Sequence, residues 1–165
     1  MLAAVDKADW RIVFLFLHVL GAVVALGFSL SYGLWVRRAE RGDAPSRAFT
    51  LGTISWIDRR FTTPAYVNQL ATGVILGLIG GAETFEQAWL QLAIGIYVVI
   101  VVLAITAYGP AFRAQRQLAE RIAGGSDEEA AYPAASSRAR SLGLVVTGLT
   151  LVVLVLMVWK PALWS

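Results

Sequence analysis

The chain has a single histidine, His18, and this residue lies inside a long apolar run. Imidazole binds haem iron and exchanges a proton near neutral pH, so its position in a sequence is informative. Residues 12–35 around it carry no fixed charge, and about 20 such residues cross the hydrocarbon core of a bilayer. An ionisable side chain at that depth indicates a functional site, or a neutral histidine that bonds a neighbouring helix.

Small residues lie near His18 on the same face of the expected helix, with Ala22 and Ala25 at steps of three and four and Gly21 beside it. Small side chains permit close approach of another helix or of a flat porphyrin ring. His18 is therefore a candidate ligand of haem iron, in haem b or another porphyrin, or a candidate proton-handling group. One histidine cannot supply two axial histidines within one chain, so a haem here needs an open side, another ligand or a dimer.

Lys160, in "MVWKP" at the end of the last apolar run, is the second candidate for binding a cofactor. Its long side chain could turn inward to a carboxylate, such as a porphyrin propionate. The alternative is that it reaches out to lipid headgroups beside Trp159, as lysines at helix ends commonly do.

The second apolar run combines small and polar residues at helical spacing. Gly73, Gly77 and Gly81 form a small-xxx-small strip, which is typical of a close packing surface between helices. The neighbouring polar residues are expected to hydrogen-bond to another helix; they are Asn68, Gln69 and Thr72.

Composition and absences exclude several classes of function. The chain is 58% hydrophobic and 15% charged, whereas soluble domains are about half apolar and about one quarter charged. There is no cysteine, no glycine-rich phosphate loop and no pair of intramembrane carboxylates. The net charge of +3 comes from arginines that flank apolar runs, so membrane topology explains it better than nucleic-acid binding.

These residues must be positioned by membrane helices. The sequence predicts an all-α bundle that forms one domain over residues 1–165, with spans at 12–35, 64–81, 89–108 and 142–159. The first and third loops are rich in arginine, and the second has Glu83 and Glu86 but no basic residue. Basic loops stay in the cytoplasm, so both termini are expected outside.

Two further helices and a weak repeat are also expected. Residues 49–61 place Phe49, Ile54, Ile57 and Phe61 roughly on one face, which predicts a short amphipathic helix at the inner surface. Residues 111–123 should form a cytoplasmic extension of the third span. Tyr-Gly-x-x-x-Arg and Thr-Gly each occur twice, about 75 residues apart. The repeats indicate two helical hairpins in a parallel repeat, or chance recurrence in glycine-rich helices.

The chain resembles a bacterial family of predicted four-helix membrane proteins of unknown function, domain-of-unknown-function family 2269. The segments that carry the resemblance are "FLHVLGA", "RRFTTPAYVNQLATG", "GPAFRAQRQLAE" and "LMVWKP". This family is distantly similar to copper-resistance membrane domains and membrane protoporphyrinogen oxidases. The resemblance implies a bacterial inner membrane, and porphyrin chemistry through a first-span histidine, here His18, and a lysine that Lys160 matches loosely. The further histidines of haem-binding relatives are missing, which argues against a bis-histidine haem.

The favoured expectation is a non-enzymatic accessory or structural subunit, in a homo-oligomer or a larger membrane complex, with a tetrapyrrole at His18 as its candidate ligand. The alternative is a protoporphyrinogen-oxidase-like enzyme that uses His18 and Lys160. A small transporter is disfavoured because the spans contain few polar groups.

Overall fold

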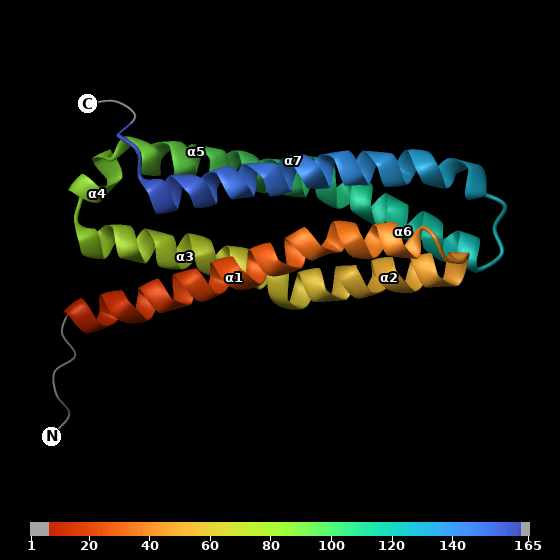
Figure 1. Cartoon of the computed structure of the whole chain (residues 1–165), viewed down its shortest axis with the longest axis horizontal. Helices are drawn as coiled ribbons and strands as arrows, with labels where there is room; N and C mark the ends of the chain where they lie inside the picture. Colours follow the sequence, from red (N-terminus) through yellow and green to blue (C-terminus); the bar gives the residue numbers. More distant parts are fainter. Residues whose placement is uncertain (1–6, 163–165) are drawn as a thin grey trace, which may run out of the picture.

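The computed structural model describes residues 7–162, and its regular structure there is helical. The elements are α1 (Lys7–Ala39), α2 (Ala44–Ile57), η1 (Asp58–Thr62), α3 (Thr63–Gly80), α4 (Glu83–Glu86), α5 (Ala88–Leu103), η2 (Ala104–Tyr108), α6 (Gly109–Ala123), η3 (Glu129–Ala131) and α7 (Tyr132–Trp159). Figure 1 shows them as four long rods packed side by side, with α4 and both described ends of the chain at one end of the bundle. The predicted all-α bundle is confirmed.

Two of the rods are continuous helices that pass through a wider π-helical turn. η1 joins α2 to α3 just before Pro64, and η2 joins α5 to α6 just before Pro110. Proline has no N–H to donate, and its ring clashes with the carbonyl four residues earlier, so a wider turn lets the helix continue. The span predicted to start at Pro64 is not a separate helix, because α2 continues into it through η1. The helical extension predicted over residues 111–123 exists as α6, which continues the third span through η2.

The helix predicted over residues 49–61 exists, but its buried face differs from the predicted one. Ile54 and Ile57 are buried as expected, whereas Phe49 is 77% exposed and Leu51 is buried in its place. The reason is that α2 runs along α6, so its face is set by contact with a protein surface (Figure 1). Leu51 packs there with Leu118 and Tyr132.

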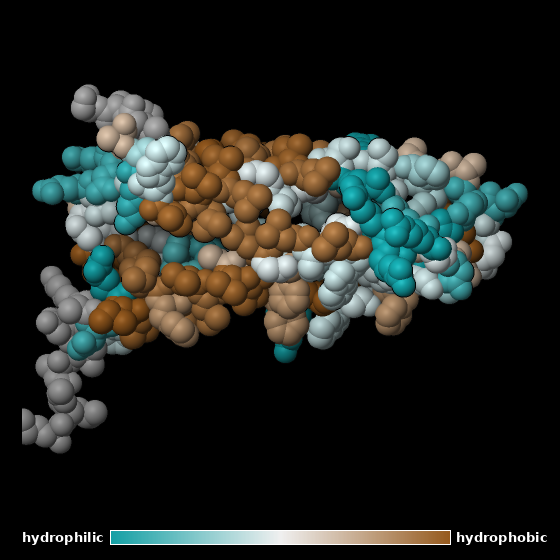
Figure 2. Space-filling model, in the orientation of Figure 1, coloured by the Kyte–Doolittle hydropathy of each residue, from teal (hydrophilic) through white to brown (hydrophobic). Residues whose placement is uncertain are grey.

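The apolar surface covers only part of the bundle length. Figure 2 shows a band of hydrophobic side chains in the half nearer the termini, with some hydrophilic ones at the tip of that half and others gathered at the opposite end. We call that opposite end, formed by α2, α6 and the first turns of α7, the basic end. α1 alone has 33 residues and so is about 50 Å long, more than the roughly 30 Å of a hydrocarbon core. The bundle therefore extends beyond a membrane at its basic end.

Three helical stretches in the described part of the chain are long and apolar enough to cross a membrane, namely Asp9–Ala39, Ala88–Ala123 and Glu129–Trp159. The remaining predicted span corresponds to α3, which has 18 residues and is less apolar because it carries Asn68 and Gln69. Membrane crossing by α3 stays a prediction.

The long helices pair in sequence order, since α1 packs on α3 and α5 packs on α7. The first half of the chain thus contains the long helices α1 and α3, with α2 of the basic end between them in sequence. The second half contains α5 and α7, with α6 of the basic end between them. The two tyrosines of the Tyr-Gly-x-x-x-Arg repeat, Tyr32 and Tyr108, each contact the other helix of the same half. The Tyr32 hydroxyl lies 2.6 Å from Thr62 Oγ1, and the Tyr108 ring lies against Gly143 of α7. A common origin of the two halves stays a prediction.

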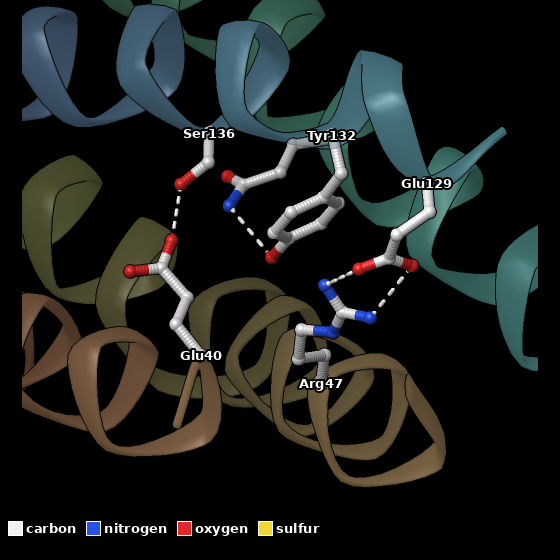
Figure 3. A network of polar contacts seen from close by, with 6 residues as sticks. Glu40, Arg47, Glu129, Tyr132 and Ser136 are labelled. Atoms are coloured by element: carbon white, nitrogen blue, oxygen red, sulfur yellow. Dashed lines mark hydrogen bonds and ion pairs between the residues drawn. The ribbon is translucent and has the colours of Figure 1, made fainter. Parts of the chain in front are cut away.

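A polar network holds the basic end together (Figure 3). Arg47 of α2 forms a bidentate ion pair with the two carboxylate oxygens of Glu129, at 2.6 and 2.8 Å. Its guanidinium lies 4.7 Å from the centre of the Tyr132 ring. At the end of α1, Glu40 accepts a hydrogen bond from Ser136 and pairs with Arg140 at 2.7 Å. The network therefore ties α1 and α2 to the start of α7.

Acid is expected to loosen this network. The hydrogen bond from Arg47 lowers the pKa of the exposed Glu129 carboxyl below its ordinary value of 4.5. Because the folded-state pKa is the lower one, the pair stabilises the fold above the unfolded-state pKa, and this contribution is lost as pH falls through the folded-state pKa. The thermal unfolding midpoint in detergent should therefore drop below about pH 5. The variant R47Q should show a shallower drop, and parallel pH curves for the two proteins would contradict this.

Candidate functional site

His18 lies half-buried on α1, where this helix crosses α3 within the apolar half of the bundle. The two helices approach closely because Gly21 of α1 has no side chain: a Cβ there would lie 2.5 Å from Asn68 Nδ2. On the other helix, a Cβ at Gly73 would lie 3.3 Å from His18 Cε1. Glycines on both helices thus let the imidazole ring lie directly against the backbone of α3.

Two amide side chains of α3 fasten this crossing. Asn68 Nδ2 donates to the backbone carbonyl of Leu17 at 2.8 Å, and Gln69 Nε2 donates to the backbone carbonyl of His18. Each amide gives a helical carbonyl a second hydrogen bond, which is valuable where water is excluded. The backbone on which His18 sits is therefore held from α3.

The hydrogen bonds of Thr72 define the tautomer of the ring. Thr72 Oγ1 lies 2.6 Å from the Asn68 carbonyl oxygen, and a carbonyl can only accept, so the hydroxyl proton points there. The same Oγ1 lies 2.9 Å from His18 Nδ1 and has only its lone pairs left for that contact. We therefore assign the ring proton to Nδ1. A neutral imidazole protonated at Nδ1 keeps a free lone pair on Nε2.

The ring makes its side-chain hydrogen bond through Nδ1, and it also has a hydrogen-bond contact with the backbone of Gln69 on α3. No described side chain hydrogen-bonds to Nε2. A charged imidazole inside lipid is costly, so the neutral form with its open Nε2 is favoured. Metal-bound histidines commonly have this arrangement, with one nitrogen on the metal and the other N–H donated to an oxygen that fixes the ring. Within residues 7–162 no three His, Cys, Asp or Glu side chains gather into a metal site. The arrangement therefore suits a metal that brings its other donors with it, as haem iron does.

Hydroxyl groups continue from this site toward the basic end. Ser29 Oγ lies 3.2 Å from the Tyr66 hydroxyl, and Tyr97 of α5 donates to the backbone carbonyl of Tyr66 at 2.7 Å. The Tyr32–Thr62 bond follows closer to the basic end. Tyr97 is a polar contact between the hairpins that was not predicted from the sequence, although a tyrosine in the middle of an aliphatic run is a signal that its hydroxyl needs a partner.

The remaining small residues have several roles. Ala25 is 1% exposed on the buried face of α1, with Ala22 partly buried one turn earlier. Phe85 of α4 lies over Gly77, so this glycine receives an aromatic ring from the helix that follows α3. Gly81 ends α3 with a φ of +92°, a conformation that favours glycine, and no atom lies within 4 Å of where its Cβ would be.

Lys160 lies just after α7, at the end of the bundle that also holds the start of α1. Its left-handed backbone, with a φ of 48°, caps α7, and its Nζ lies 5.5 Å from the centre of the Trp89 ring. The structure thus brings His18 together with Asn68, Gln69, Thr72 and Gly73, while the described contacts of Lys160 are with α5 instead.

An apolar helical bundle with a polar site on a lipid-embedded helix defines an integral membrane protein. The chain belongs to the DUF2269 family of predicted integral membrane proteins, which matches residues 12–161. No curated protein and no solved structure matches the chain.

Proposed function

We propose that this protein is an accessory subunit of a bacterial inner-membrane complex that binds a tetrapyrrole, with haem b as the candidate, through Nε2 of His18. The observation that carries the proposal is the bond from His18 Nδ1 to Thr72, which makes Nε2 the candidate ligand atom. Bound haem would supply an iron able to take up an electron or a further ligand. The role of the chain is to hold the ring and exclude water around it.

The single histidine shapes this proposal. One chain can supply one imidazole, so a haem held by two histidines would need the second from another copy or another subunit. The exposed apolar helix surfaces at the level of His18, such as Val19 and Val23, would then be covered by haem, lipid or that partner. This favours a homo-oligomer or a larger membrane complex.

The orientation follows from charge. The proposed arrangement has four spans, with the basic end in the cytoplasm and both termini outside, because arginine-rich loops are retained on the cytoplasmic side. His18 then lies in the outer half of the bilayer, about 12 Å from Trp10 at 1.5 Å per residue. The site is thus placed to serve a partner in the membrane or on its outer side.

Haem titration of the purified protein tests the proposal. Protein in mild detergent should develop a Soret band that differs from that of free haem and saturates at one haem per chain, or at one per two chains if copies share it. Imidazole added in excess should change the spectrum by filling the open side. A spectrum that stays that of free haem in detergent at every ratio would contradict the proposal.

The alternative is a protoporphyrinogen-oxidase-like enzyme. One observation supports it, namely that Lys160 has no acidic partner within residues 7–162. Its ammonium group makes no ion pair with the described residues, so it is available to a porphyrin propionate. In this version His18 handles protons and Lys160 holds the substrate. Oxidation of added protoporphyrinogen by the purified protein, with a quinone supplied as the electron acceptor, would support the enzyme if it is lost in K160Q. Haem binding without such oxidation would support the accessory subunit.

A further inference from the structure

A groove at the basic end lies apart from the His18 site and is open to the surface. It runs between the last turns of α1 and the first turns of α2 and has a volume of about 750 Å³. Its walls include Leu34, Trp35, Arg38, Arg41, Ser46 and Thr50. The groove therefore combines an apolar wall, two cations and two hydroxyl groups within one concave surface.

The positive charge of this groove is not neutralised by the protein. Arg38 and Arg41 are exposed and form no ion pair with any described residue. The two nearest acids in the sequence make other contacts, because Glu40 pairs with Arg140 and Asp43, the cap of α2, accepts hydrogen bonds from the backbone N–H and the hydroxyl of Ser46. Two guanidinium groups without an ion pair, beside the hydroxyl of Thr50, are suited to a phosphate group.

The apolar wall indicates where the rest of the ligand lies. Leu34 is 69% exposed and Trp35 is 40% exposed at the level where the apolar surface of α1 ends. Leu30, 49% exposed one turn earlier, extends this surface into the apolar half of the bundle. A ligand that fills the groove and follows this surface has an anionic head and a hydrocarbon tail. Tryptophan and arginine at this depth are typical of the membrane interface.

We propose that this groove binds an anionic phospholipid, with the headgroup phosphate between Arg38 and Arg41 and an acyl chain along Leu34 and Leu30. Charge complementarity and continuity with the apolar face both favour a lipid over a free anion. The site is separate from His18, so it stands whether or not the protein binds a tetrapyrrole.

Native mass spectrometry of the full chain tests this proposal, with equal amounts of phosphatidylglycerol and phosphatidylcholine added to the detergent. The wild type should retain phosphatidylglycerol preferentially. The double variant R38Q/R41Q should bind it about 30-fold more weakly, because each arginine near the surface contributes about 1 kcal/mol. The matched control is R59Q/R60Q, which removes the same charge from an exposed arginine pair in η1 and should bind like the wild type.

Three results would overturn the proposal. Equal retention of the two lipids would remove the anionic preference. An equal loss in R38Q/R41Q and R59Q/R60Q would show that overall charge, and not this groove, attracts the lipid. Displacement of phosphatidylglycerol by millimolar inorganic phosphate would show that the groove binds free anions. Circular dichroism of each variant establishes that the helices are intact, so a loss of binding can be read as a loss of the site.

Discussion

Replacing His18 with alanine is expected to abolish specific haem binding by this protein. His18 is the only histidine in the chain, so the variant has no imidazole to offer to iron. The absorbance of H18A with added haem should match that of free haem in the same detergent. The helices should stay folded, because the contacts of Asn68 and Gln69 with α1 are to backbone carbonyls that alanine retains.

A graded companion variant separates ligation from simple packing. T72V removes the hydroxyl that accepts the Nδ1 proton but preserves the shape of the side chain. Haem affinity should fall 10- to 100-fold, about the usual cost of losing the group that orients a ligating histidine. T147V in α7 changes the other Thr-Gly repeat and is the matched control, with affinity expected to stay that of the wild type. A Soret band that persists unchanged in H18A would contradict the assignment of the site.

Replacing Tyr132 with alanine is expected to lower the free energy of unfolding by about 3–5 kcal/mol, the usual cost of removing a large buried aromatic side chain. Tyr132 is 4% exposed and packs with Leu51 and Leu118 where α2, α6 and α7 meet. The variant also removes the ring over which the Arg47 guanidinium lies. This site lies at the basic end, outside the apolar half, so unfolding would expose the ring to water. The hydrophobic contribution of the ring to the free energy of unfolding is therefore lost in the variant.

The variant Y132F isolates the contribution of the hydroxyl. It keeps the ring and removes only the 3.3 Å hydrogen bond from Gln115, so about 1 kcal/mol is the expected loss. Chemical unfolding in detergent, followed by circular dichroism, measures both variants. A loss in Y132A no larger than that in Y132F would contradict the view that packing of this ring joins the two halves of the bundle.

The helical bundle could be predicted because its signal is local. In lipid, an uncharged run such as residues 12–35 must satisfy its backbone hydrogen bonds internally, and a helix does this within one segment. The breaks in that pattern were harder to read. Pro64 was expected to start a span because proline is favoured at the first position of a helix, and the wider turn that carries α2 into α3 there has no distinct signal in the sequence.

The site could be predicted only in part. A histidine in an apolar run indicated that position 18 matters, and Asn68, Gln69 and Thr72 were expected to bond another helix. That these residues lie against His18 depends on the register between α1 and α3, for which the sequence carries no direct signal. The choice of Nε2 as the ligand atom in turn rests on two hydrogen bonds of one hydroxyl, a feature that exists only once the helices have packed.

Nitrogen NMR of the single histidine tests the central claim most directly. With ¹⁵N-labelled histidine, the chain gives signals from one imidazole ring, so no assignment is needed. We predict a neutral ring protonated at Nδ1, with an unprotonated Nε2 whose signal alone changes strongly when haem is added. A ring protonated at Nε2, or at both nitrogens at neutral pH, would contradict the account, because the ligand atom would then be blocked.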